Sequence, residues 1–370
     1  GACWHPSKRG YPKIGNLQIM DKIEIKGYKS FRNLTLDLLP INILIGSNGS
    51  GKSNFLSFFE FLNRLYEQKL TEYVALGGGI DKYFFQGSKV TDTICATIYF
   101  KDNFYSFELK EGDSRFVFSK EKLGYHNSSF DIASFGNEAN IKSYNGLSRG
   151  EYIKKYLSEI KKYHFHDTGK SSPFTKESHI VNDVYYLYEK GENLAAFLYG
   201  IRENSPITYK RIVRVIQSIA PYFSDFYFNV SAADTVRLQW TDKFSSTIYG
   251  PTDLSDGTVR FIALTTLFLQ PVPPKVIIID EPELGLHPLA IQKLAGLIKS
   301  VAARGTQVIV ATQSADLITN FDAENVITVN QVEGVSVMER LKPESLESWL
   351  EDYTLGDLWK QNILKGGQPK

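Results

Sequence analysis

The chain has 370 residues, of which 42% are hydrophobic, and its 42 Lys and Arg against 41 Asp and Glu leave a formal net charge of +1. At roughly 150 residues per domain this length predicts two or three domains, and the balanced charge excludes recruitment to nucleic acid or membranes by bulk charge alone. Two cysteines, Cys3 and Cys95, exclude a disulfide scaffold, and no apolar run is long enough for a membrane span or a signal core, so we expect a cytoplasmic protein without a membrane partner.

The first third of the chain predicts strands around one helix. Residues 1–20 are expected to form a tail, and the runs over 22–45 alternate apolar and polar residues as strands do. A glycine-rich turn follows, and then a helix over about 53–70 whose apolar side chains recur at helical spacing. The alternating runs after this helix predict an antiparallel β lobe. Together these segments are expected to form the N-terminal part of one domain, over residues 21–142.

Helical patterns dominate residues 143–230 and predict a helical subdomain inserted into that domain. Its clearest helical segments are 151–162, 192–204 and 207–223. An α/β pattern returns over 231–340, with an apolar strand at 275–280, and residues 341–370 predict a C-terminal helical tail. The sequence therefore predicts an α/β fold with a mixed sheet at its core, an antiparallel β lobe and an inserted helical subdomain.

The strongest motif is GSNGSGKS, which matches the phosphate-binding loop G-x-x-x-x-G-K-[ST] between an apolar strand and a helix. The glycines let backbone N–H groups surround a phosphate, and the helix N-terminus adds a favourable dipole. Lys52 is placed to contact the β- and γ-phosphates, and the Ser53 hydroxyl to ligate Mg²⁺. The motif predicts ATP and Mg²⁺ as cofactors. The residues expected to bind the nucleotide are Gly46, Ser47, Asn48, Gly49, Ser50, Gly51, Lys52 and Ser53.

The segment KVIIIDEPELGLHP places two carboxylates, Asp280 and Glu281, directly after an apolar strand. Open α/β sheets bind their ligands at the carboxyl ends of such strands. We expect Asp280 to hold Mg²⁺ through water and Glu281 to act as the general base on the attacking water. The alternative is that these residues are two surface carboxylates after a core strand. The presence of a phosphate loop in the same chain disfavours this interpretation.

The segment LSDGT, residues 254–258, opens a further helical pattern and resembles the LSGGQ signature of the ABC-type ATPases. In that superfamily the signature serine and glycine of one protomer contact the γ-phosphate bound to the other, and these positions are Ser255 and Gly257 here. A serine N-cap with free backbone N–H groups suits an anion, although Ser255 could also serve only as a helix cap. Asp256 departs from the usual glycine, a form that recurs in the RecF/SMC-like branch.

Three further residues take roles from this resemblance. In IVATQSADLI, Gln313 stands where many ABC ATPases place a histidine against the γ-phosphate; glutamine can hydrogen-bond but carries no charge, which predicts slow hydrolysis. His287 stands in the loop that faces the partner protomer, or is a plain surface histidine before a helix. Gln86 is the candidate for the glutamine that senses Mg²⁺ and the attacking water, or is an ordinary loop residue.

Beyond about residue 20, nearly the whole chain resembles the stand-alone ATPases of the RecF/SMC-like ABC branch, often called AAA-family ATPases. Besides the motifs above, the stretches YHFHDTG, GENLAAFL and YTLGDLWKQNILKGGQP resemble that group. The resemblance implies an ABC-type P-loop head that closes as a head-to-tail homodimer, or a higher homo-oligomer, around two ATP.

For two other clusters of residues the sequence allows two alternative roles each. His164, His166 and Asp167 could hold a metal, because alternate residues of a strand share a face, but a structural or subunit-contact role is favoured since no further ligands can be named. Basic residues in two predicted helices could track a phosphate backbone or be solvated helix faces. These are Lys154, Lys155, Lys161, Lys162, Lys210, Arg211 and Arg214.

The preferred function is a regulatory ATPase. Its dimer would close on ATP and control a separately encoded effector, expected to be a nuclease, in prokaryotic anti-phage defence, as the family pattern suggests. The first alternative is a RecF-like protein that binds DNA with ATP for repair or maintenance. The second is a nucleotide-dependent scaffold with little turnover, a reading motivated by Gln313 and opposed by the intact Glu281.

Overall fold

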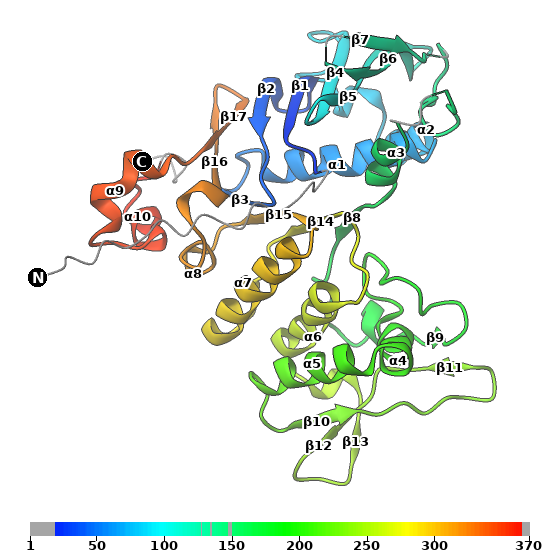
Figure 1. The fold of residues 1–370 in the computed structure, drawn as a ribbon, viewed down its shortest axis with the longest axis vertical. Helices are drawn as coiled ribbons and strands as arrows, with labels where there is room; N and C mark the ends of the chain where they lie inside the picture. Colours follow the sequence, from blue (N-terminus) through cyan, green and yellow to red (C-terminus); the bar gives the residue numbers. More distant parts are fainter. Residues whose placement is uncertain (1–18, 127, 134, 147–149, 365–370) are drawn as a thin grey trace, which may run out of the picture.

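A mixed six-stranded sheet, buried on both faces, forms the centre of the molecule (Figure 1). The computed structural model describes residues 19–126, 128–133, 135–146 and 150–364, so most of the predicted N-terminal tail and the last six residues of the C-terminal tail lie outside the described residues. In order across the sheet, the strands are β17 (Val335–Arg340), β16 (Val326–Val332), β3 (Ile41–Ile45), β15 (Gln307–Thr312), β14 (Val276–Asp280) and β8 (Ile160–Tyr163). All are parallel except β17, and the apolar runs of β3, β14 and β15 are typical of strands covered on both sides.

A second, antiparallel sheet covers one face together with helix α1 (Lys52–Tyr66). Its strands, in order, are β2 (Phe31–Asp37), β1 (Lys22–Tyr28), β4 (Thr93–Phe100), β5 (Asn103–Gly112), β6 (Arg115–Tyr125) and β7 (Ser128–Asp131). Every second side chain of β4 is buried, as the alternating pattern predicted. Helices α6 (Asp256–Leu269) and α7 (Pro288–Ala303) cover the opposite face.

The predicted helix over 53–70 is shorter than expected, because the chain turns after Tyr66. Gln68 adopts a left-handed conformation with φ 58°, and a second helix, α2 (Leu70–Leu76), begins. The carboxylate of Glu138 accepts hydrogen bonds from the backbone N–H groups of Leu70 and Thr71. These contacts cap α2 from a distant part of the chain, which local periodicity cannot reveal.

The predicted helix over 151–162 is wrong in its second half. Helix α3 (Glu151–Ser158) ends, and β8 begins two residues later as the edge strand beside β14. Lys161 and Lys162 therefore lie on a strand, and the Lys162 ammonium pairs with Glu60 on α1 at 3.3 Å. Residues 160–163 form a strand rather than a helix because the backbone N–H and C=O groups on this edge of β14 need hydrogen-bond partners. The domain bounds stay a prediction, although β8 falls inside the predicted insertion.

The remaining segment between β8 and α6 projects from the side of the sheet opposite the antiparallel lobe (Figure 1). It contains α4 (Leu194–Asn204), α5 (Pro206–Gln217) and short strands β9 (Ser178–His179), β10 (Phe223–Phe226), β11 (Thr235–Val236), β12 (Trp240–Asp242) and β13 (Ile248–Tyr249). At the C-terminal end lie α8 (Ala315–Ile318), α9 (Pro343–Leu350) and α10 (Leu355–Lys360). None of the helices in the described part of the chain has the length and apolar character that crossing a membrane requires.

Candidate nucleotide-binding site

The predicted motifs meet at the carboxyl ends of four adjacent parallel strands. The register pairs Ile45 with Thr312, Ala311 with Asp280, and Ile279 with Tyr163. The phosphate loop (residues 46–53), the switch segment (residues 312–314), the acidic motif (Asp280 and Glu281) and the segment after β8 therefore follow one another along one sheet edge. The sequence predicted the first three as neighbours, and this edge is the usual ligand-binding position in open α/β sheets.

The phosphate loop is held from outside by the β16–β17 hairpin. Gly51 has φ 115°, and a Cβ there would lie 2.0 Å from the Ser336 hydroxyl, so only glycine fits. The Ser336 hydroxyl donates to the Ser50 carbonyl at 2.7 Å. This support comes from a residue almost 300 positions away, which the loop motif itself does not indicate.

Lys52 is 5% exposed, and its ammonium donates to the carbonyls of Gly46 at 2.6 Å and Ser47 at 2.9 Å. Burial lowers the pKa of Lys52, and the charges of Asp280 and Glu281 oppose this shift. The cation is therefore already inside the loop that would surround a phosphate.

Ser53 and Asp280 are brought together as predicted for a magnesium site. The Ser53 hydroxyl donates to Asp280 Oδ2 at 3.3 Å. Burial raises the pKa of Asp280, and the nearby charge of Glu281 adds to the rise, while Lys162 and the Ser53 hydrogen bond oppose it. Two oxygen donors suit Mg²⁺, which binds through one or two protein groups and completes its shell with water and phosphate oxygens.

Glu281 and Gln313 are in direct contact. The Gln313 amide donates to Glu281 Oε1 and, at 2.7 Å, to the Asn48 side-chain oxygen in the phosphate loop. Glu281 has φ 43°, which is uncommon for a residue other than glycine and recurs at functional sites. One glutamine thus connects the predicted base to the loop that would hold the phosphates.

The signature lies against the loop after the acidic motif. Ser255 caps α6 by accepting from the Thr258 N–H at 3.2 Å, and a Cβ at Gly257 would lie 2.4 Å from the Gly285 carbonyl oxygen. His287 Nδ1 accepts from the Leu289 N–H at 3.3 Å, which leaves its Nε2 edge available. A cavity of about 150 Å³ lies between the two segments, lined among others by Ser255, Gly257, Gly285 and His287.

Buried Arg260 is a site residue that the sequence did not indicate. Its guanidinium donates to the carbonyls of Phe165 at 3.0 Å, His166 at 3.1 Å and Leu284. It therefore joins the signature helix to the acidic-motif loop and to the segment after β8. The sequence around Arg260 is an apolar helical run. The one feature that could have indicated its role is a charged residue at a position where a core residue is expected.

Gln86 lies in the loop before β4 and has φ 57°. It lines a cavity of about 550 Å³ with Lys29, Ser30, Asn54 and Gly334 among others, and its role in sensing Mg²⁺ stays a prediction. His164 and His166, by contrast, follow β8 on the flank of Asp280, with their rings 4.5 Å apart. In the described residues, no group of three or more His, Cys, Asp or Glu side chains is arranged to hold a metal ion.

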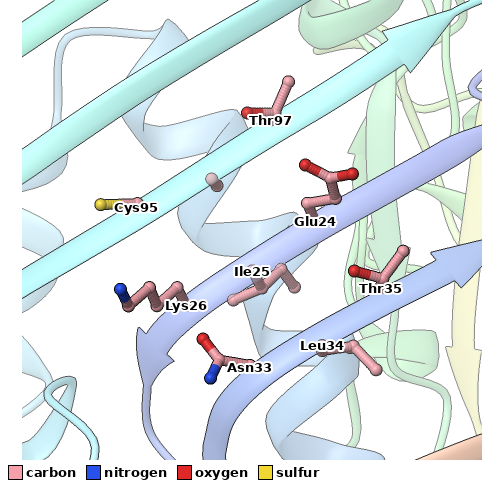
Figure 2. Close-up of a pocket in the computed structure, with 9 residues that line it drawn as sticks. Glu24, Ile25, Lys26, Asn33, Leu34, Thr35, Cys95 and Thr97 are labelled. Atoms are coloured by element: carbon pink, nitrogen blue, oxygen red, sulfur yellow. The ribbon is translucent and has the colours of Figure 1, made fainter.

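A separate hollow of about 260 Å³ lies on the outward face of β1, β2 and β4 (Figure 2). Polar side chains of the three strands surround it, and no residue of the phosphate loop, acidic motif or signature contributes to its lining. The residues drawn there include Glu24, Lys26, Asn33, Thr35, Cys95 and Thr97. The hollow is therefore not part of the site.

Comparisons with known proteins identify the family and the fold of the chain. A family model described as "AAA domain, putative AbiEii toxin, Type IV TA system" matches residues 41–319. The energy-coupling factor transporter ATP-binding protein EcfA2 of Lactobacillus delbrueckii subsp. bulgaricus is 26% identical over 140 residues, which cover 36% of this chain and 47% of that protein. The chain thus spans about half the length of this relative.

Solved structures of SMC heads share the fold. An SMC head bound to the C-winged helix domain of ScpA aligns with a TM-score of 0.61 at 18% identity, covering 89% of this chain and 99% of that one. An SMC head with an extended coiled coil from Pyrococcus furiosus, bound to the C-terminal domain of ScpA, gives 0.55 at 17%, covering 90% and 98%. The α/β fold and the ABC-type resemblance are confirmed. With more than half of its length matched by the family model, the chain belongs to this AAA-domain family, and it has the fold of the SMC heads.

Proposed function

We propose that the protein binds and hydrolyses ATP and uses the nucleotide to close a head-to-tail dimer that controls a separately encoded effector. The observation that carries the proposal is the arrangement at one sheet edge of Lys52, the Ser53–Asp280 pair and the Glu281–Gln313 contact. Phosphate binding, metal binding and water activation each have a side chain at this edge.

Each residue has a defined part in hydrolysis. The backbone N–H groups of the phosphate loop and the Lys52 ammonium would hold the β- and γ-phosphates. Ser53 and Asp280 would hold Mg²⁺, which neutralises phosphate charge when bound. Glu281 would take the proton of the attacking water, while Gln313 orients the Glu281 carboxylate against the phosphate loop.

The dimer part of the proposal rests on the signature cavity. Ser255, Gly257 and His287 line one small cavity in which none of the phosphate-loop residues takes part. Backbone N–H groups at the start of the 14-residue helix α6 and the His287 ring offer hydrogen bonds that the chain's own phosphate loop does not use. A γ-phosphate presented by a second copy would satisfy them, so we place Ser255, Gly257 and His287 against the partner's ATP.

The effector is proposed to bind the insertion between β8 and α6. This region exposes large apolar side chains, with Tyr185, Tyr186 and Phe244 77%, 60% and 87% exposed. Exposed aromatic residues are typical anchors of protein interfaces. A nuclease of anti-phage defence remains our proposed partner, as the family pattern suggests.

Nucleic-acid binding is the second candidate, and the observation that favours it is a basic strip on α5 and α7. Both helices pack on α6, and the Arg211 guanidinium on α5 donates to the Ser300 hydroxyl on α7 at 3.5 Å. Neither helix contains Asp or Glu. With the residue that follows α7, they carry Lys210, Arg211, Arg214, Lys293, Lys299 and Arg304. Six cations without a carboxylate, in a chain of net charge +1, form a local field that suits a phosphate backbone.

The first experiment compares the wild type with Glu281→Gln in Mg-ATP. The proposal expects phosphate release by the wild type, and ATP binding with dimer accumulation but little turnover by the variant. The samples are treated with nuclease before copurification. A protein that still copurifies is identified as the effector if the addition of ATP changes the activity of that protein. Equal turnover by the two proteins would refute Glu281 as the base, and ATP-driven dimers without turnover in the wild type would favour the scaffold.

The second candidate is tested with a 30-bp duplex DNA at several salt concentrations. Removing two cations of the strip, by Arg211→Gln with Arg214→Gln, is expected to reduce the slope of log K against log salt by about 2. The matched control removes Lys101 and Arg115, two cations exposed on hairpins of the antiparallel sheet. An equal effect of both double variants would show general polyanion binding, and no effect of the strip variant would exclude this surface.

A further inference from the structure

Glu283, two residues after the proposed base, is a buried carboxylate that the proposed function does not use. It is 8% exposed. The Thr312 hydroxyl donates to its Oε1 oxygen, whereas Oε2 is buried without a hydrogen-bond partner among the described residues. A buried polar group of this kind, beside a catalytic site, needs an explanation in terms of what it holds in place.

Thr312 connects Glu283 to the switch segment. Thr312 is fully buried at the end of β15, and its hydroxyl accepts from the Ser314 N–H at 2.9 Å. Gln313, between these two residues, extends its amide to Glu281 and Asn48. The turn over residues 281–283 is therefore joined to the switch segment twice, once through Glu281 and Gln313 and once through Glu283 and Thr312.

These two connections restrain the backbone at Glu281, whose conformation would be energetically unfavourable without them. Glu281 has φ 43°, and its N–H donates to the Ala311 carbonyl at 2.8 Å, which ties the same turn to the end of β15. Residues in this region of φ/ψ space persist where the surroundings fix them. Of the two side-chain contacts, the one between Glu283 and Thr312 is buried, whereas the other joins the exposed Gln313 to the half-buried Glu281.

We propose that Glu283 is a positioning residue for ATP hydrolysis: through Thr312 it fixes the switch segment so that Gln313 stays in contact with Glu281. This inference rests on the proposed function. Burial raises the pKa of Glu283, and the hydrogen bond from Thr312 opposes the rise. Because Oε2 has no hydrogen-bond partner in the described part of the chain, the role requires one accepting oxygen rather than the charge of a carboxylate.

Three variants test the proposal. Glu283→Gln keeps an accepting oxygen for Thr312 and should retain kcat within about threefold, whereas Glu283→Ala and Thr312→Val should each lower kcat at least tenfold with the ATP Kd changed less than threefold. The double variant Glu283→Ala with Thr312→Val should be no slower than the slower single variant, because both changes remove the same contact. Unchanged ATP binding shows that each variant is folded.

Hydrogen exchange at the Ser314 amide gives a readout that needs no hydrolysis. With Mg-ATP bound, exchange should be faster than in the wild type for Glu283→Ala and Thr312→Val, and unchanged for Glu283→Gln. A wild type without turnover would contradict the proposed function, while this exchange pattern would still decide the positioning role. Wild-type kcat and exchange in Glu283→Ala would overturn the proposal, and so would a Glu283→Gln variant as slow as Glu283→Ala, since the charge itself would then be required.

Discussion

The side-chain amide of Gln313 donates to the carboxylate of Glu281 and at the same time to Asn48 in the phosphate loop, so a neutral residue links the predicted base to the predicted phosphate site. A glutamine in this position can orient hydrogen bonds but cannot contribute a positive charge to the transition state.

Removing the amide tests this role. Gln313→Ala is expected to lower kcat about 10- to 100-fold, because one preorganised hydrogen-bond donor is lost at the reacting centre. The ATP Kd should change little, since phosphate contacts of Lys52 and the loop remain. Steady-state phosphate release and fluorescent-nucleotide binding measure the two quantities. A loss of ATP binding equal to the loss of kcat would instead make Gln313 a ground-state binding residue.

Lys52 is expected to decide whether ATP binds at all. In Lys52→Ala the loop loses its only buried ammonium among the described loop residues, and the ATP Kd should rise at least about 100-fold. Isothermal calorimetry measures this change. Lys154→Ala is the control, because Lys154 is a similarly buried lysine on α3 that pairs with Glu151 instead. Weaker ATP binding by both variants to the same degree would indicate damage to folding rather than loss of a phosphate contact.

The phosphate loop, the acidic motif and the switch could be predicted because their chemistry depends on neighbouring residues in the sequence. Gly51, Lys52 and Asp280 lie where the strand–loop–helix and strand–acid patterns placed them. Residues defined by distant contacts could not be found in this way. The roles of Arg260 and Glu283 depend on hydrogen bonds to carbonyls and to a hydroxyl that lie far away in the sequence.

The segment after β8 shows the same limit. Its preceding strand carries two lysines, and the pattern favoured a helix that continued from α3. The strand forms because β14 offers unpaired backbone groups at the sheet edge, a tertiary requirement that overrides local periodicity. As a result His164 and His166 follow a strand that flanks Asp280.

Asp280→Asn is expected to stabilise the protein without nucleotide while removing the magnesium site. The pKa of Asp280 is raised by burial and by Glu281, so the folded state binds this proton more readily than the unfolded state does. The contribution of Asp280 to the free energy of unfolding is therefore complete below its ordinary pKa and is lost as pH rises through the raised value.

Thermal denaturation in EDTA at pH 5 and pH 8 tests this sign. At pH 8 the variant's Tm should exceed that of the wild type by on the order of 1–3 °C, and the difference should be smaller at pH 5, because a raised pKa lets the wild-type carboxyl bind its proton progressively as the pH falls. Glu347→Gln, a change in an exposed carboxylate on α9, serves as the control. A variant less stable than the wild type at pH 8 would show that the Ser53–Asp280 hydrogen bond outweighs the cost of burying the charge.

Ser255→Arg separates the dimer from the nucleotide site of a single chain. The side chain of Ser255 lines the cavity beside Gly257 and His287, where an arginine would fill the space proposed for the partner's γ-phosphate. ATP-induced dimerisation, followed by size-exclusion chromatography with light scattering in a Glu281→Gln background, is expected to disappear. ATP binding by the monomer should stay within about threefold of the parent, because the phosphate loop shares no lining residue with this cavity.

Ser255→Ala is the matched control for the helix cap, since it removes the hydrogen bond to the Thr258 N–H without adding bulk. Dimers that persist in Ser255→Arg would refute the head-to-tail arrangement, and loss of ATP binding in the monomer would place Ser255 in the site of its own chain.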